Sequence, residues 1–112
     1  MARGSGRRND PGVLIMTSLA AGAQHGYALA RDIERFAGVT LGPGTLYGAI
    51  TALEESGLIE PTGHDERRRP YQLTAAGQAE LTAAVRTLGA IAAEGARRLG
   101  IAWDGPRPGW AQ

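Results

Sequence analysis

The chain has 112 residues, a formal net charge of +1 and no cysteine, and all 12 of its basic residues are arginine. Its length fits one ordinary domain and excludes two, and the lack of thiols excludes disulfides, cysteine nucleophiles and thiolate metal sites. Arginine keeps its charge at any cellular pH and binds phosphate bidentately. The use of arginine alone also has a second explanation, because the codon bias of a GC-rich genome would produce the same composition.

The first ten residues are polar and carry three arginines, Arg3, Arg7 and Arg8. Because no apolar side chain beyond the first two positions anchors this segment, we expect residues 1–10 to form a flexible basic arm.

The longest apolar stretch follows, over residues 13–21. It is too short to span a membrane and lacks the cleavage pattern of a secretion signal, so we expect a soluble cytoplasmic protein with no membrane partner.

Three short helices are predicted next, from apolar side chains at helical spacing, over residues 11–21, 26–37 and 43–56. Asn9 or Asp10 can cap the first helix, and a proline falls in the first turn of the first and the third. Gly22, Gly38 and Gly57 follow the three helices and are the predicted C-terminal stops.

Two short strands are predicted after these helices, over residues 58–62, with an interruption at Pro61, and residues 69–74. The turn between them, residues 63–68, holds an acidic tip (His64, Asp65 and Glu66) and then Arg67 and Arg68, while Arg69 begins the second strand. Taken alone, an arginine run in a turn is most often solvated and paired to nearby carboxylates. Three helices followed by a hairpin, however, are the order of a winged helix-turn-helix, whose third helix enters the DNA major groove while the wing contacts the backbone or minor groove.

A long final helix is predicted after Thr74, which can cap it. Its apolar or small residues recur at steps of four and three, which is typical of a helix that packs against a partner; they are residues 81, 85, 88, 92, 95 and 99. Regular structure should end near Gly100 or Trp103. The expected fold is mainly α with a small β-hairpin, divided into a basic arm (1–10), a winged helix-turn-helix (11–74), a dimerisation helix (75–103) and a flexible tail (104–112).

No catalytic or metal site is predicted. His25 and His64 are too few, with no thiols nearby, to hold a metal ion. The acidic residues form no pair at a spacing that suits general acid and base chemistry, and Ser18 and Ser56 have no histidine in plausible reach. We therefore expect neither enzyme activity nor a cofactor.

Five motifs between His25 and Leu81 resemble the PadR-type family of bacterial transcriptional regulators. They are HGY at 25–27, GTLY at 44–47, LE at 53–54, GLI at 57–59 and RRPYQLTAAG at 68–77. Each motif alone is weak, but their order and spacing over about half the chain are specific. The resemblance implies a homodimeric repressor that binds a pseudo-palindromic double-stranded DNA operator. A chain with one helix after the wing resembles the short subfamily.

The resemblance also implies roles for single residues. The implied DNA-binding residues are Tyr27, Gly44, Thr45, Tyr47, Thr51, Arg67, Arg68 and Arg69. The implied dimerisation residues are Leu14, Leu81, Val85, Leu88, Ala92 and Leu99. Trp103 is implied as a residue that lines a cavity for a small aromatic effector, with packing against the partner as its alternative role. Without the resemblance, Tyr27 and Tyr47 would be interpreted as core tyrosines with their hydroxyls at the surface, and Tyr71 is expected in the core.

Two positions depart from the family pattern. Gly42 stands where the family tends to have serine, and Gly48, Thr51 and Ala52 stand where many relatives carry basic residues. The helix over residues 43–56 therefore has no positive charge, and its base contacts would be limited to hydroxyl hydrogen bonds and small-group contacts with thymine. The alternative function is a ligand-sensing or protein-interaction module that keeps the scaffold but has lost specific DNA binding.

Overall fold

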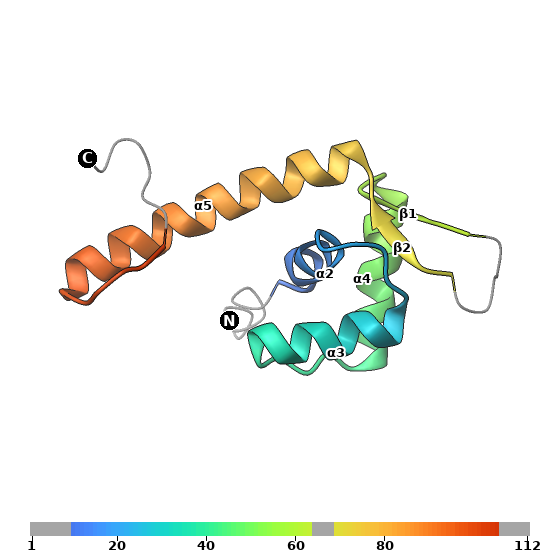
Figure 1. Cartoon of the computed structure of the whole chain (residues 1–112), viewed down its shortest axis with the longest axis horizontal. Helices are drawn as coiled ribbons and strands as arrows, with labels where there is room; N and C mark the ends of the chain where they lie inside the picture. The colour runs from blue at the N-terminus through green and yellow to red at the C-terminus, as the bar shows by residue number, and fades with distance from the viewer. Residues whose placement is uncertain (1–9, 64–68, 106–112) are drawn as a thin grey trace.

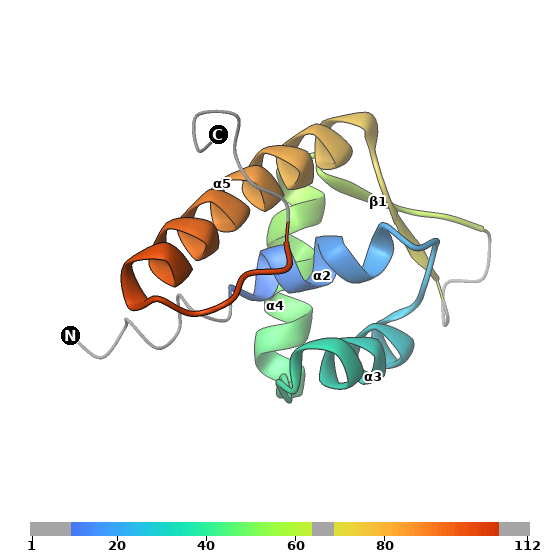
Figure 2. The same cartoon turned by 60° about the vertical axis from the view of Figure 1, so that its left-hand side comes forward.

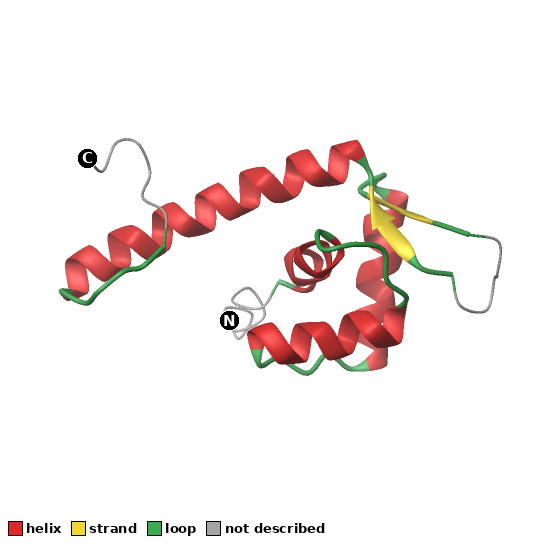
Figure 3. Cartoon of the chain, in the orientation of Figure 1, coloured by secondary structure: helices red, strands yellow, loops and turns green. Residues whose placement is uncertain are grey.

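The structure, a computed structural model, describes residues 10–63 and 69–105. Its elements are α2 (Pro11–Leu19), α3 (Gly26–Ala37), α4 (Pro43–Glu55), β1 (Ile59–Pro61), β2 (Tyr71–Leu73) and α5 (Ala75–Leu99). The first three helices form one body with the hairpin beside it, and α5 extends beyond this body at the opposite end from the hairpin (Figures 1 and 3). The predicted fold class, mainly α with a small hairpin, is confirmed.

The helix caps explain where the helices begin and end. Asp10 caps α2 by accepting hydrogen bonds on Oδ1 from the amides of Gly12 (2.9 Å) and Val13 (3.4 Å). Gly38 and Gly100 end α3 and α5 in the left-handed conformation that favours glycine. These starts and stops follow the predictions from sequence.

The end of α2 differs from its prediction, because the helix stops at Leu19 and not at Gly22. The amides of Ala21 and Gly22 donate to carbonyls three residues back, so the chain turns more tightly there than an α-helix. This turn delivers Gln24 to β2, where its backbone N–H donates to the Tyr71 carbonyl (3.1 Å) and its carbonyl accepts from the Tyr71 amide (2.7 Å). A long-range pairing therefore sets the end of α2.

The hairpin pairs β1 with β2 antiparallel, with Pro61 opposite Tyr71. Both strands are shorter than predicted, although the amide of Thr62 still donates to the Pro70 carbonyl at 2.7 Å. Pro61 does not interrupt β1 because the backbone polar groups of Tyr71 are directed to Gln24 on its other side. The missing N–H of the proline thus breaks no ladder bond.

The core lies where α2 packs against α3, α4 and α5. Its buried members come from the four helices and β1; they are Ile15, Met16, Leu19, Leu29, Ile33, Leu46, Ile50, Leu53, Ile59 and Leu81. Each fully buried side chain of this kind contributes roughly 1.5–3 kcal/mol. Tyr71 is half-buried and packs against this core, as expected, while its neighbour Gln72 is exposed.

Gly77→Ala is expected to destabilise the fold, because a Cβ at Gly77 would collide with the backbone carbonyl of Leu58. Overpacking of this kind costs about 1–3 kcal/mol, and backbone cannot move aside as a side chain can. Gly48→Ala is the control, since Gly48 lies within α4 and faces open space. It should gain up to about 1 kcal/mol from helix propensity. Urea unfolding measures both, and a Gly77→Ala variant as stable as wild type would contradict this packing.

Candidate nucleic-acid interface

The exposed side of α4 consists of small and hydroxyl-bearing residues up to Ala52, and the helix ends in the exposed carboxylates of Glu54 and Glu55. Leu46, Ile50 and Leu53 turn into the core. The exposed positions include Gly44, Thr45, Tyr47, Gly48 and Thr51. The face that the fold leaves open on this helix is therefore the one on which the sequence predicts DNA contacts. No basic residue lies between Pro43 and Glu55.

Two tyrosines, one on α3 and one on α4, lie at the surface and not in the core. The Tyr27 side chain is 66% exposed and the Tyr47 side chain 52%. The Tyr47 ring, from α4, lies over Gly26 at the start of α3, since a Cβ built on Gly26 would be 2.5 Å from the Tyr47 hydroxyl oxygen. Any side chain at position 26 would meet the Tyr47 ring, so this ring lies directly against the start of α3. The core interpretation of both tyrosines is wrong.

Arg31, which was not among the predicted DNA-binding residues, extends this surface. It lies one turn after Tyr27 on α3, and its Nη1 donates to the Tyr27 hydroxyl at 3.4 Å. Its guanidinium carbon is 5.7 Å from the centre of the Tyr27 ring, within the range of a cation–π contact. The spacing of four residues on a helix was the signal that could have revealed this pair.

The wing is described only in part. Arg69 is half-buried and precedes Pro70 at the base of the hairpin. Arg67 and Arg68 lie outside the described residues, and so do Arg3, Arg7 and Arg8 of the predicted arm.

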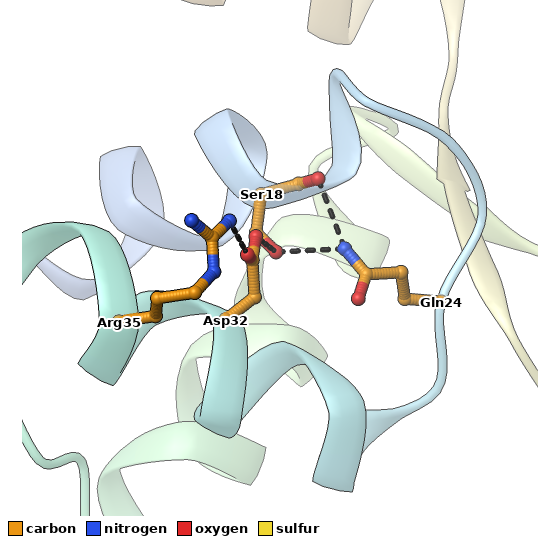
Figure 4. A network of polar contacts seen from close by, with 4 residues as sticks. All are labelled: Ser18, Gln24, Asp32 and Arg35. Carbon is orange, nitrogen blue, oxygen red and sulfur yellow. Dashed lines mark hydrogen bonds and ion pairs between the residues drawn. The ribbon is translucent and has the colours of Figure 1, made fainter.

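A polar network joins α2, α3 and the segment that pairs with the wing (Figure 4). The buried Ser18 hydroxyl donates to Asp32 Oδ2 at 2.7 Å, and Arg35 Nη2 donates to Asp32 Oδ1 at 2.6 Å. Gln24 Nε2 donates to the hydroxyl (2.8 Å) and the carbonyl (3.0 Å) of Ser18. Because the Gln24 backbone pairs with Tyr71, this network connects the hairpin to the helices.

Asp32→Asn tests this network through pH. The hydrogen bond from Ser18, followed by that from Arg35, holds the pKa of Asp32 below its ordinary value of 3.8. The carboxylate therefore adds stability above that pH, and the contribution disappears as pH falls through the lowered pKa. Asp32→Asn should be less stable than wild type at pH 7, and the gap should narrow at pH 3. Urea unfolding at both pH values measures it; an equal gap at both would show that the charge of Asp32 contributes nothing.

An apolar face remains uncovered on α5. Val85, Leu88, Ile91 and Leu99 are each more than half exposed there. Ile91 was missed by the sequence analysis, because it lies beside the strict four-and-three stripe. Ala92 is half-buried. Leu81 is buried in the core of the protomer and offers a partner little surface.

A groove of about 460 Å³ lies between α2 and α5 beside this face. Leu14 and Val13 line it from α2, and Ala84 and Leu88 from α5. Leu14 is half-buried and packs against the core. The groove thus places two of the residues predicted for dimerisation, Leu14 and Leu88, on one surface.

The segment after α5 turns back along the helix (Figure 2). The amide of Ile101 donates to the Ala96 carbonyl at 3.0 Å, and the small residues Ala93 and Ala96 are buried. Trp103 is half-buried, and a Cβ on Gly105 would collide with its ring. The tryptophan predicted for an effector site therefore packs against its own tail. Among residues 10–63 and 69–105 no group of acidic, histidine or cysteine side chains is arranged to hold a metal ion, and no helix could cross a membrane.

Comparison with known proteins gives three kinds of match. The model of the transcriptional regulator PadR-like family matches residues 15–83. An uncharacterized 37.1 kDa protein in transposon TN4556 of Streptomyces fradiae is 46% identical over 72 residues, which is 64% of this chain and 21% of that protein. The chain thus spans about a fifth of the length of that curated relative.

Two solved structures illustrate the structural likeness. RosR of H. salinarum is 28% identical with a TM-score of 0.64, and the match covers 70% of this chain and 72% of that one. A PadR-like transcriptional regulator from Bacillus cereus is 17% identical with a TM-score of 0.74, and the match covers 91% and 99%. The second likeness is one of fold alone.

Proposed function

We infer the function from the family, because the chain belongs to the PadR-like transcriptional regulators, which are non-enzymatic DNA-binding proteins that commonly dimerise. We propose that this chain is a homodimeric repressor that binds a pseudo-palindromic operator. The observation that carries the proposal is the pair of exposed tyrosines, Tyr27 and Tyr47, joined at Gly26 beside the open face of α4. Large aromatic side chains with hydroxyl tips at such a surface suit contact with a nucleic-acid backbone.

Recognition by α4 would rest on uncharged groups. Thr45 and Thr51 offer hydroxyls and methyl groups to base edges, and Gly44 allows close approach. Such contacts discriminate between bases but attract DNA weakly, since affinity comes mainly from phosphate neutralisation. We therefore assign most of the affinity to the arginines of the wing, Arg67, Arg68 and Arg69.

Dimerisation would use α5. The residues proposed to contact a second copy are Val85, Leu88, Ala92 and Leu99 along this helix and Leu14 at the adjoining groove. Burial of their exposed apolar surface against that copy is favourable. Leu81 is already buried in the core of the protomer, so it would hold α5 in place and not contact the second copy itself. A two-fold dimer presents two copies of α4 to half-sites about one helical turn apart, roughly 34–36 Å.

Footprinting tests the proposal. On a fragment that contains the DNA upstream of the protein's own gene, we expect two protected half-sites whose centres are about 10 base pairs apart. A reporter under that DNA should be expressed less when the protein is present. A fragment without any protected site would contradict specific binding there.

An alternative function is favoured by one observation, the absence of positive charge on α4. A ligand-sensing or protein-interaction module would give no footprint on any genomic fragment, but a small aromatic effector would still raise the melting temperature. Trp103 is the residue proposed to contact such an effector. If the chain is a repressor, binding of the same effector would cause it to dissociate from the operator.

Gly26→Ala is expected to weaken operator binding while the fold persists. The added methyl would displace the Tyr47 ring, which is exposed and free to turn outward, so the core is spared. We expect a loss of at least tenfold in affinity, about 1.4 kcal/mol. Fluorescence anisotropy measures the loss, and the urea midpoint of the same sample serves as the control. Unchanged affinity would show that the position of Tyr47 is unimportant for DNA binding.

A further inference from the structure

We propose that Arg31, held by Tyr27, binds a phosphate of the DNA backbone next to α4 and supplies a positive charge that α4 lacks. This inference rests on the proposed function and adds a binding residue to it. On α3 and α4 together the basic residues are Arg31 and Arg35, and both belong to α3. Within these two helices, positive charge beside the recognition surface therefore comes from the exposed face of α3.

The placement of Arg31 suits a backbone contact. Tyr47 on α4 lies against Gly26, Tyr27 follows Gly26, and the Arg31 guanidinium lies over the Tyr27 ring. The exposed Tyr47, Tyr27 and Arg31 are thus linked from α4 to α3 through Gly26. In a helix-turn-helix the first helix crosses the DNA backbone while the second occupies the groove. A phosphate beside the groove would then face the Tyr27 and Arg31 end of α3.

Arg31 also has further N–H groups available to donate hydrogen bonds. Its one described hydrogen bond goes to the Tyr27 hydroxyl, and a guanidinium has five N–H groups. The ion pairs of the described residues involve Arg35, Arg97 and Arg98, not Arg31. The ring contact holds the guanidinium in place without neutralising it. Less side-chain conformational entropy is therefore lost when a phosphate binds.

Acidic groups limit the site to one end of α3. A groove of about 650 Å³ runs from Tyr27 and Arg31 past Asp32 and Glu34 to Thr40. Glu34 Oε2 accepts from the Thr40 hydroxyl at 3.0 Å and would repel a phosphate at that end. The phosphate site is therefore the exposed edge at Tyr27, not the groove as a whole.

Arg35 is the matched control, because it lies one turn further along the same helix and carries the same charge. Its guanidinium is bound to Asp32 Oδ1 at 2.6 Å and so belongs to the network of Figure 4. Arg31→Gln and Arg35→Gln remove the same charge from α3. Arg31→Lys keeps the charge and gives up the flat guanidinium.

The experiment compares these variants by anisotropy with the duplex from the protein's own upstream region, at several NaCl concentrations. Arg31→Gln should flatten the slope of log K against log[NaCl] by about 0.9 for each phosphate that is no longer neutralised, one per protomer. Arg31→Lys should restore most of the slope, and Arg35→Gln should match wild type. Equal slopes for Arg31→Gln and wild type, or equal effects of Arg31→Gln and Arg35→Gln, would overturn this inference alone. A wild type that binds no duplex would overturn the proposed function with it.

Discussion

The triple variant Arg67→Ala/Arg68→Ala/Arg69→Ala is expected to bind the operator at least a hundredfold more weakly than wild type, about 2.7 kcal/mol. Because α4 carries no positive charge, it cannot replace the wing arginines, which are the densest run of positive charge in the chain. The slope of log K against log[salt] should flatten by about 0.9 for each phosphate left without its arginine. Anisotropy titrations at several salt concentrations measure both quantities.

A second triple variant separates the wing from net charge. Arg86→Ala/Arg97→Ala/Arg98→Ala removes three positive charges from α5 instead. If binding depends on where the arginines lie, this variant should keep most of the wild-type affinity and slope. Equal losses of affinity in the two triple variants would mean that only overall charge matters, and the wing would have no special role.

The double variant Val85→Asp/Leu88→Asp is expected to convert the proposed dimer to monomers and to weaken operator binding at least a hundredfold. Both side chains are about half exposed on the apolar face of α5, and a carboxylate buried there without a partner costs several kcal/mol. A monomer then holds one half-site, and the second half-site no longer adds to its affinity. Light scattering at micromolar concentration gives the mass, and anisotropy gives the affinity.

Ala79→Asp/Thr82→Asp is the matched control for that variant. It adds the same two carboxylates to α5 at exposed positions outside the apolar face. This control should remain a dimer with wild-type affinity. A Val85→Asp/Leu88→Asp protein that also remains a dimer would place the interface on another surface.

Local signals were sufficient to predict most of the fold. Thr74 caps α5 by accepting a hydrogen bond from the Gly77 amide at 3.0 Å, and Gly38 and Gly100 end their helices, because such caps involve residues close in sequence. The end of α2 could not be predicted in this way. It depends on pairing between Gln24 and Tyr71, which are far apart along the chain.

The candidate site was less predictable than the fold. Without the family resemblance Tyr27 would be interpreted as a core tyrosine, and its exposure was suggested by that resemblance alone. Ser18 was considered as a catalytic nucleophile, but its hydroxyl donates to Asp32. The stripe on α5 included Leu81 and omitted Ile91, because spacing alone does not show where the helix leaves the core. Such properties depend on tertiary neighbours, which a spacing pattern does not contain.

The most direct test of DNA-binding repression is the ratio of two dissociation constants for the wild-type protein at about 150 mM salt. One duplex is the protein's own upstream region, and the other is a scrambled duplex of equal length and composition. For a specific regulator we expect a preference of at least about 10³ and two chains bound per operator. A ratio near one on this and every other tested genomic fragment would contradict the proposed function and favour the ligand-sensing or protein-interaction module.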